Sequence, residues 1–192
     1  MKIVYIHGAN ATGDSFNYIR HHIKHKNEYV IEYDSNDGFH NNLLSMKEQL
    51  KDYKDIFFIG HSLGGIYALH LSEYLDDKVL GACTLSTPYN GCESAEYIKH
   101  FFPHHRLFRD IGPNSDPIKL SKKIEIKHSW TNIISIVGSN PLILSSNDGV
   151  VTIDSMKYRS DMELIDLSVN HYEIVLSSKT IDIIKDKIKG VK

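Results

Sequence analysis

Short apolar runs alternate with amphipathic stretches along most of this chain, and this alternation narrows the folds that it can adopt. Several of the runs are apolar at nearly every position, as expected of strands that are buried on both faces. The stretches between them place apolar side chains at helical spacing. We therefore expect an α/β fold, in which a mostly parallel sheet is flanked by helices. The predicted strands cover residues 3–6, 29–33, 56–59, 79–85, 133–137 and 163–167, and the predicted helices cover 14–25, 39–51, 63–75 and about 172–188.

Residues 90–129 break the alternation. This segment has no clear strand, and it contains the turn-forming sequence Gly112-Pro113-Asn114-Ser115-Asp116-Pro117. A long insertion in a compact domain is commonly a lid or another functional loop. We expect residues 1–192 to form a single domain, with a lid-like insertion at about 90–129 that crosses the C-terminal edge of the sheet.

The charge of the chain is nearly balanced. Lys and Arg number 22 and Asp and Glu number 24, and a net charge of −2 is not suited to binding nucleic acid. No run approaches the roughly 20 apolar residues of a membrane span, so we expect no stable membrane insertion. The first predicted strand follows Met1 and Lys2 at once, without room for a secretion signal. We therefore expect a cytoplasmic protein, with a monomer favoured and with Cys83 and Cys92 as free thiols.

The pentapeptide Gly60-His61-Ser62-Leu63-Gly64 lies between the strand predicted at 56–59 and the helix predicted at 63–75. A Gly-x-Ser-x-Gly sequence in this context is typical of a sharp strand-to-helix turn, since small flanking residues permit the close approach of the backbone. The turn holds the serine hydroxyl at a helix N-terminus, where backbone N–H groups favour developing negative charge. Ser62 is therefore a candidate nucleophile for a carbonyl carbon.

A serine hydroxyl needs a base that takes its proton. Of 12 histidines only His171 lies beyond residue 128, and it falls between the last predicted strand and the last predicted helix. In open α/β sheets, reactive groups gather at the carboxyl ends of the strands. We therefore predict that His171 is the base, with a solvent-exposed or capping loop histidine as the alternative.

An acid that orients the base should precede it in the chain. Asp148 is favoured because it lies in a loop, Ser146-Asn147-Asp148-Gly149, after the strand predicted at 133–137. The Asp-Gly pair also suits a tight turn, so Asp148 could serve the turn alone. Asp154 is a rival, and Asp166 is a weaker one because it falls inside the last predicted strand.

Two backbone N–H groups should stabilise an oxyanion. One is that of Leu63, directly after the nucleophile, and the other should come from the loop His7-Gly8-Ala9-Asn10 that follows the first strand. Ala9 is the preferred second donor and Asn10 is the alternative.

These motifs together resemble the lipase and esterase branch of the α/β-hydrolase superfamily. The resemblance rests on Tyr5-Ile6-His7-Gly8 (oxyanion loop), Gly60-His61-Ser62-Leu63-Gly64-Gly65 (nucleophile elbow), Leu85-Ser86-Thr87-Pro88-Tyr89-Asn90-Gly91, Asn147-Asp148-Gly149-Val150-Val151 and Asn170-His171. It implies a minimal α/β-hydrolase fold with six strands in the order 2-1-3-4-5-6. It also implies a serine esterase with a Ser62–His171–Asp148 catalytic triad.

The expected reaction is the hydrolysis of a small-molecule or lipid carboxylic ester through an acyl-enzyme on Ser62, without a cofactor. An acyltransferase, a thioesterase or an amidase would use the same triad. The alternative outside the enzymes is a non-catalytic binding module on a hydrolase scaffold. No metal site is expected, because His100, His104 and His105 lack the cysteine or carboxylate partners usual for structural zinc. Five aromatic or apolar side chains could line an acyl pocket or fill the core: Phe101, Phe102, Phe108, Ile111 and Trp130.

Overall fold

Six strands form one sheet in the computed structural model, which describes residues 1–96, 104, 106–141 and 143–191. The strand order is β2-β1-β3-β4-β5-β6, and every neighbouring pair is parallel. The expected α/β architecture and strand order are therefore confirmed. The strands are β1 (Lys2–Ile6), β2 (Glu28–Ile31), β3 (Ile56–His61), β4 (Val79–Leu85), β5 (Ser129–Ser135) and β6 (Glu163–Leu167).

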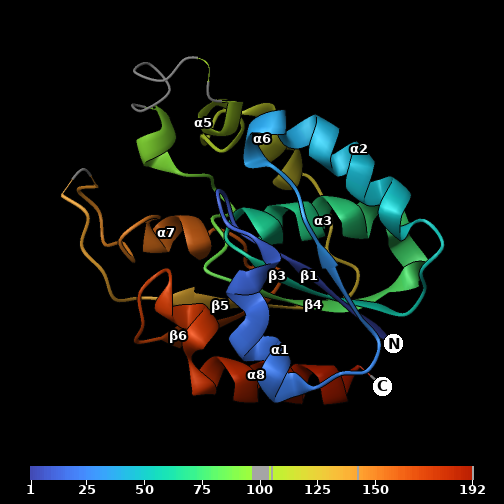
Figure 1. Ribbon diagram of the computed structural model, residues 1–192. Coiled ribbons are helices and arrows are strands. Elements are labelled where there is room, and N and C mark those ends of the chain that lie inside the picture. Colours follow the sequence, from blue (N-terminus) through green and yellow to red (C-terminus); the bar gives the residue numbers. More distant parts are fainter. Residues whose placement is uncertain (97–103, 105, 142, 192) are drawn as a thin grey trace.

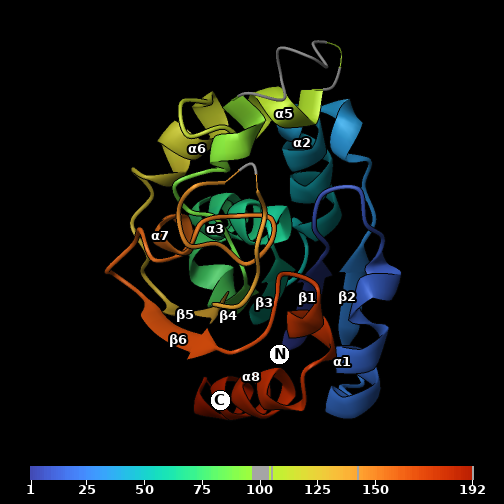
Figure 2. The ribbon, with the colours of Figure 1, turned by 90° about the vertical axis from the view of Figure 1, so that its left-hand side faces the viewer.

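Helices cover both faces of the sheet (Figures 1 and 2). On one face lie α2 (Phe39–Leu50), α3 (Leu63–Leu75), α5 (Arg106–Asp110) and α6 (Asp116–Ser121), and on the other lie α1 (Asn17–Ile23) and α8 (Ser178–Gly190). The short helix α7 (Ile153–Met156) precedes β6, and 3₁₀ turns occur at η1 (Gly13–Phe16), η2 (Ser35–Asp37), η3 (Asp76–Lys78) and η4 (Glu173–Leu176). None of the helices in these described residues is both long and apolar enough to cross a bilayer.

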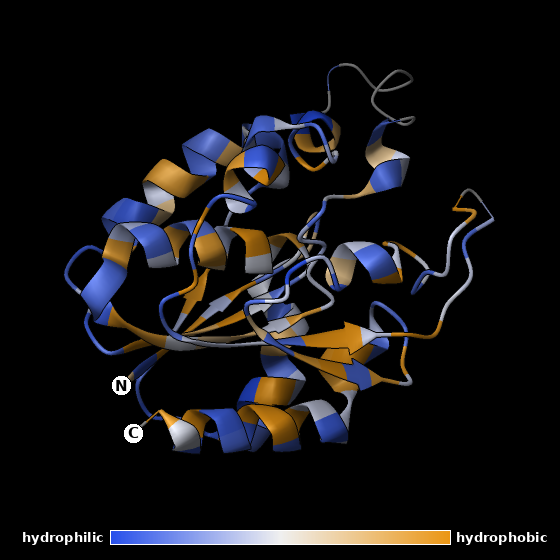
Figure 3. Cartoon of the chain, turned by 180° about the vertical axis from the view of Figure 1, so that it is seen from behind, coloured by the Kyte–Doolittle hydropathy of each residue, from blue (hydrophilic) through white to orange (hydrophobic). Residues whose placement is uncertain are grey.

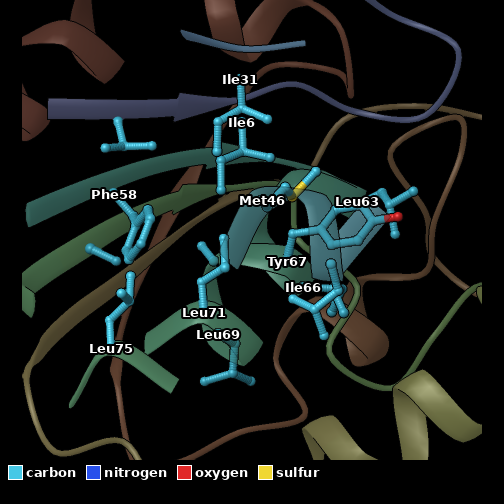
Figure 4. Packing of buried hydrophobic residues seen from close by; sticks show 14 of the residues in the cluster. Ile6, Ile31, Met46, Phe58, Leu63, Ile66, Tyr67, Leu69, Leu71 and Leu75 are labelled. Carbon is cyan, nitrogen blue, oxygen red and sulfur yellow. The ribbon is translucent and has the colours of Figure 1, made fainter. Parts of the chain in front are cut away.

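Alternate side chains of the central strands enter two hydrophobic cores, as the period of two in a strand requires. Val4 and Phe58 pack with Leu71 of α3 in the core between the sheet and α2 and α3, whose packing is seen in Figure 4. Ile3 and Phe57 pack with side chains of α1 and α8 on the opposite face. The hydropathy colouring accordingly places apolar residues on the strands and polar ones on the outer turns of the helices (Figure 3).

The strand predicted at 133–137 is shifted in the structure, because β5 begins four residues earlier, at Ser129. Thr131 and Asn132 are polar but fully buried strand residues. The Asn132 side chain accepts a hydrogen bond from Thr84 Oγ1 at 2.9 Å and donates one to the Met156 carbonyl at 2.9 Å. These partners satisfy its polar atoms and remove the cost of burying them, a compensation that an apolar pattern does not reveal.

The helix predicted over about 172–188 is divided into η4 and α8. Ser177 between them is extended, with φ −83° and ψ 128°. The Asn170 side chain accepts hydrogen bonds from the N–H groups of Tyr172 and Glu173, both at 2.9 Å, and so begins a separate turn directly after His171. The loop that carries His171 is thereby fixed at the carboxyl edge of the sheet.

Candidate active site

Ser62 lies in the turn between β3 and α3, with φ 51° and ψ −119°, a strained backbone conformation for a residue with a side chain. Close packing produces this turn. A Cβ atom on Gly64 would lie 1.9 Å from the Ile6 carbonyl oxygen, so only glycine lets the start of α3 approach β1 so closely. The N–H of Ser62 donates to the Leu85 carbonyl at 2.8 Å. The serine is therefore held at the carboxyl edge of the sheet, half-buried, in the geometry expected of a nucleophile elbow.

Asp148 and His171 are in direct contact, although 23 residues separate them. His171 Nδ1 lies 2.7 Å from Asp148 Oδ2, and both side chains are almost completely buried. A backbone hydrogen bond of 3.1 Å from the His171 N–H to the Asp148 carbonyl joins the two loops as well. Since Nδ1 is engaged by the carboxylate, Nε2 is the ring atom left to exchange a proton with a nucleophile.

The two rival acids lie elsewhere. Asp154 is exposed in the first turn of α7. Asp166, on β6, forms an exposed ion pair with Lys157 at 2.6 Å. Of the three aspartates considered, Asp148 is the one that the fold brings to His171.

Four donors surround the Asp148 carboxylate. Oδ1 accepts the N–H groups of Val150 at 3.0 Å and Val151 at 2.9 Å. Oδ2 accepts the Ser135 hydroxyl at 2.5 Å in addition to His171 Nδ1. Burial opposes ionisation, but the hydrogen bonds from His171, Ser135 and Val151 outweigh it and hold the pKa of Asp148 below its ordinary value. The group is therefore a carboxylate at neutral pH.

Ser135 was not expected from the sequence. It is the last residue of β5, and its only sequence signal is a hydroxyl at the carboxyl end of a strand, where site residues gather in this class of sheet.

His61, the residue before Ser62, is also buried in the site. Its Nε2 lies 2.9 Å from the His171 carbonyl oxygen. Burial, together with the nearby His171, lowers the pKa of His61 to about 3, so the ring is neutral and its Nε2–H donates to that carbonyl. His61 thus orients the loop that carries His171.

The loop after β1 brings Ala9 to the same cavity as Ser62. The N–H of Asn10 donates to Ser35 Oγ at 3.0 Å, so the alternative oxyanion donor is already engaged. Leu63 is the first residue of α3, and the N–H groups of a first helical turn have no partner within the helix. The backbone N–H groups of Ala9 and Leu63 therefore remain the better pair.

Residues just beyond β2 hold the loop that carries Ala9 in place. The Tyr33 hydroxyl donates to the His7 carbonyl at 2.8 Å, and the two rings stack with centroids 4.2 Å apart. The Glu32 carboxylate accepts the Gly13 N–H at 2.9 and 3.1 Å. Both residues fall in the strand predicted at 29–33, and their contacts with this loop were not predicted.

A cavity of about 460 Å³ opens beside Ser62 and His171. Its apolar wall includes Leu107, Phe108 and Ile111, from α5 and the residue after it. Of the two alternatives given for these side chains, lining a pocket or filling the core, Phe108 and Ile111 therefore line the cavity. Trp130 instead is a core residue, whose Nε1–H donates to the Tyr89 hydroxyl at 2.8 Å. Phe101, Phe102, His100 and His105 lie outside the described residues.

Solved structures with the same fold include lipases and esterases. The lipase-esterase related protein of Clostridium acetobutylicum matches with a TM-score of 0.67 and 13% identity, over 100% of this chain and 94% of that one. The lipase BlEst2 of Bacillus licheniformis in its mature form matches with a TM-score of 0.71 and 13% identity, over 97% and 91%. A metagenomic carboxyl esterase, MGS0156, matches with a TM-score of 0.74 and 12% identity, over 100% and 75%. No protein-family model and no curated protein sequence matches the chain.

At identities of 12–13% the likeness speaks for the fold. The chain has the α/β-hydrolase fold, as the resemblance in its motifs implied.

Proposed function

We propose that this chain, which has the α/β-hydrolase fold, is a serine hydrolase that cleaves carboxylic esters. The observation that carries the proposal is the buried Asp148–His171 pair, whose His171 lines the same cavity as the strained Ser62. A nucleophile, a base and an orienting acid in this relation are the parts that acyl transfer to a serine requires.

In the proposed reaction, Ser62 Oγ attacks the ester carbonyl carbon while His171 Nε2 takes the hydroxyl proton. Asp148 stays ionised and stabilises the imidazolium, and the N–H groups of Ala9 and Leu63 donate to the oxyanion. The imidazolium then gives its proton to the leaving alcohol, which leaves an acyl-enzyme. Water attacks the acyl carbon with His171 again as base, and the carboxylic acid product and free Ser62 result.

The insertion at 90–129 is proposed to cover this site within a single hydrolase domain. Support comes from Leu107 and Phe108 of α5, which belong to that segment and line the cavity. An uncharged acyl or alcohol group is the natural neighbour of these side chains.

A fluorophosphonate probe tests the nucleophile, because it phosphonylates an activated serine and leaves a covalent adduct. We expect one adduct per wild-type chain, mapped by peptide mass spectrometry to Ser62, and no adduct on S62A. An adduct on another serine would move the nucleophile, and an unlabelled wild type would count against the proposal. Matched p-nitrophenyl butyrate, thiobutyrate and butyranilide substrates then separate an esterase from a thioesterase or an amidase.

A further inference from the structure

Two buried serines, Ser135 and Ser86, lie on the side of Asp148 that faces the interior of the protein, where Ser135 contacts the carboxylate and Ser86 contacts Ser135. Ser86 follows β4 directly and Ser135 ends β5, so the pairing of these strands brings both hydroxyls to the same edge of the sheet. Neither side chain has measurable solvent exposure. Ser86 has a positive φ of 50°, and its N–H donates to the Ile133 carbonyl at 2.8 Å. A strained backbone that is tied down in this way fixes the direction of its hydroxyl.

The hydroxyls form a chain that ends on Asp148. Ser86 Oγ and Ser135 Oγ are 2.7 Å apart, and Ser135 Oγ lies 2.5 Å from Asp148 Oδ2. A carboxylate only accepts, so Ser135 gives its single proton to Asp148, and Ser86 must then donate to Ser135. The Met156 sulfur, 3.7 Å from Ser135 Oγ, is a weak acceptor and does not compete with a carboxylate.

Ser135 and His171 share one oxygen of the acid. Both donate to Oδ2, while Oδ1 is held separately by the Val150 and Val151 N–H groups. Each donor withdraws part of the negative charge from Oδ2. The charge that Asp148 presents to the imidazole therefore depends on the Ser135 hydroxyl.

We propose that Ser135, backed by Ser86, is a positioning residue that orients the carboxylate of Asp148 and limits its attraction for the proton on His171. The inference rests on the proposed function for its kinetic readout. Without the hydroxyl, Oδ2 presents more charge to the imidazolium, so the Asp148–His171 pair keeps its proton to higher pH. The carboxylate is also freer to turn about its remaining anchors at Oδ1.

Two titratable groups near the pair, His61 and Cys92, stay neutral between pH 5 and 8. His61 has a pKa lowered to about 3, mainly by burial, and stays neutral there. Burial raises the pKa of the Cys92 thiol, which also stays neutral. A proton taken up at the site in this range is therefore not carried by His61 or Cys92.

The test compares wild type with S135A, S86A and the double variant S86A/S135A. For p-nitrophenyl acetate hydrolysis we expect kcat of S135A to fall about 3- to 10-fold with KM little changed, since the acid is misaligned while the cavity is intact. We expect the acid limb of its pH profile to move up by roughly 0.5–1 unit, because a hydrogen bond to a charged group is lost. S86A should shift the limb in the same direction by less.

The double variant separates positioning from stability. S135A leaves the buried Ser86 hydroxyl without its acceptor and should unfold more easily, whereas S86A/S135A removes both hydroxyls and should regain part of that stability. The double variant should still show the shifted acid limb. A limb at the wild-type pH in S135A and in the double variant would overturn the inference.

NMR titration of the His171 imidazole gives the same answer without turnover. We expect its protonation midpoint to rise in S135A, and coincident wild-type and S135A curves would contradict the inference. A wild type that hydrolyses no ester and reacts with no fluorophosphonate would instead contradict the proposed function, while the NMR comparison still decides the role of Ser135.

Discussion

At the scale of single residues, the site depends on one buried carboxylate. Asp148 accepts from the Val150 and Val151 N–H groups, from Ser135 and from His171. These four donors offset the cost of burying its charge. Each of these groups donates a hydrogen bond to a carboxylate oxygen. A protonated acid or an Asn side chain would place an O–H or NH₂ donor against at least one of them.

Asp148→Asn tests this residue directly. One side of the Asn amide must be NH₂, which faces donors where Asp148 presents oxygen, and the imidazole is driven toward the wrong tautomer. We expect kcat to fall by roughly 10³–10⁴-fold, as for such a replacement in a serine triad. Asp154→Asn is the matched control, and since Asp154 is exposed on α7 its kcat should stay within about twofold. An equal loss in both variants would argue against Asp148 as the orienting acid.

Sequence patterns predict Ser62 as the nucleophile and His171 as the base, because a turn motif and a late loop position can be recognised along the chain. They could only rank Asp148 above Asp154, since both follow the same predicted strand. Burial against His171 distinguishes the two, and burial of a loop residue depends on the packing of distant segments. The roles proposed for Ser135 and Ser86 could not be predicted for the same reason, because a serine at a strand end does not show which distant side chain it contacts.

At the scale of elements, the two residues after β2 hold in place the loop that carries Ala9, the proposed oxyanion donor. Residues 32–33 were expected to continue the second strand, but β2 ends at Ile31, and Tyr33 and Glu32 bind the loop that follows β1. Their contacts reach the His7 carbonyl and the Gly13 N–H, on the two sides of Ala9. The direction of the Ala9 N–H therefore depends on the two residues that follow β2.

Tyr33→Phe removes the hydroxyl that donates to the His7 carbonyl and keeps the ring that stacks on His7. We expect kcat to fall about tenfold with KM little changed, because a loosened oxyanion donor acts on the transition state. The free energy of unfolding should fall by only about 1 kcal/mol, the typical value of one hydrogen bond.

Tyr29→Phe is the matched control, since the Tyr29 hydroxyl donates to Gln49 at 3.0 Å on α2, away from the loop. Its kcat should equal that of the wild type. A Y33F enzyme with a normal kcat would show that the Tyr33 hydroxyl does not position the loop after β1 for catalysis.

The predicted bounds of β5 and of the last helix were wrong for a common reason. The start of β5 was missed because the buried Thr131 and Asn132 are polar, and their partners come from other strands and loops. The division of the last helix was missed because it depends on the Asn170 cap. In both cases a side chain replaces the hydrophobic pattern as the local determinant.

At the scale of the whole molecule, the parallel sheet explains how residues so far apart meet. Loops after β1, β3 and β6 leave the same edge and deliver Ala9, Ser62 and His171 to one cavity, and the loop after β5 brings Asp148 to the buried side of His171. Strand–helix alternation predicts this gathering from the sequence alone. The wall that Leu107 and Phe108 contribute was not predictable in detail, since residues 90–129 follow no regular pattern.

The proposed hydrolysis of esters by this molecule depends on Ser62 as the nucleophile. The most direct measurement is the turnover of p-nitrophenyl butyrate by wild type and S62A, with circular dichroism to show that both are folded. We expect saturable turnover by the wild type and a loss of roughly 10⁵-fold or more in S62A. Turnover by S62A at a rate near that of the wild type would contradict this expectation.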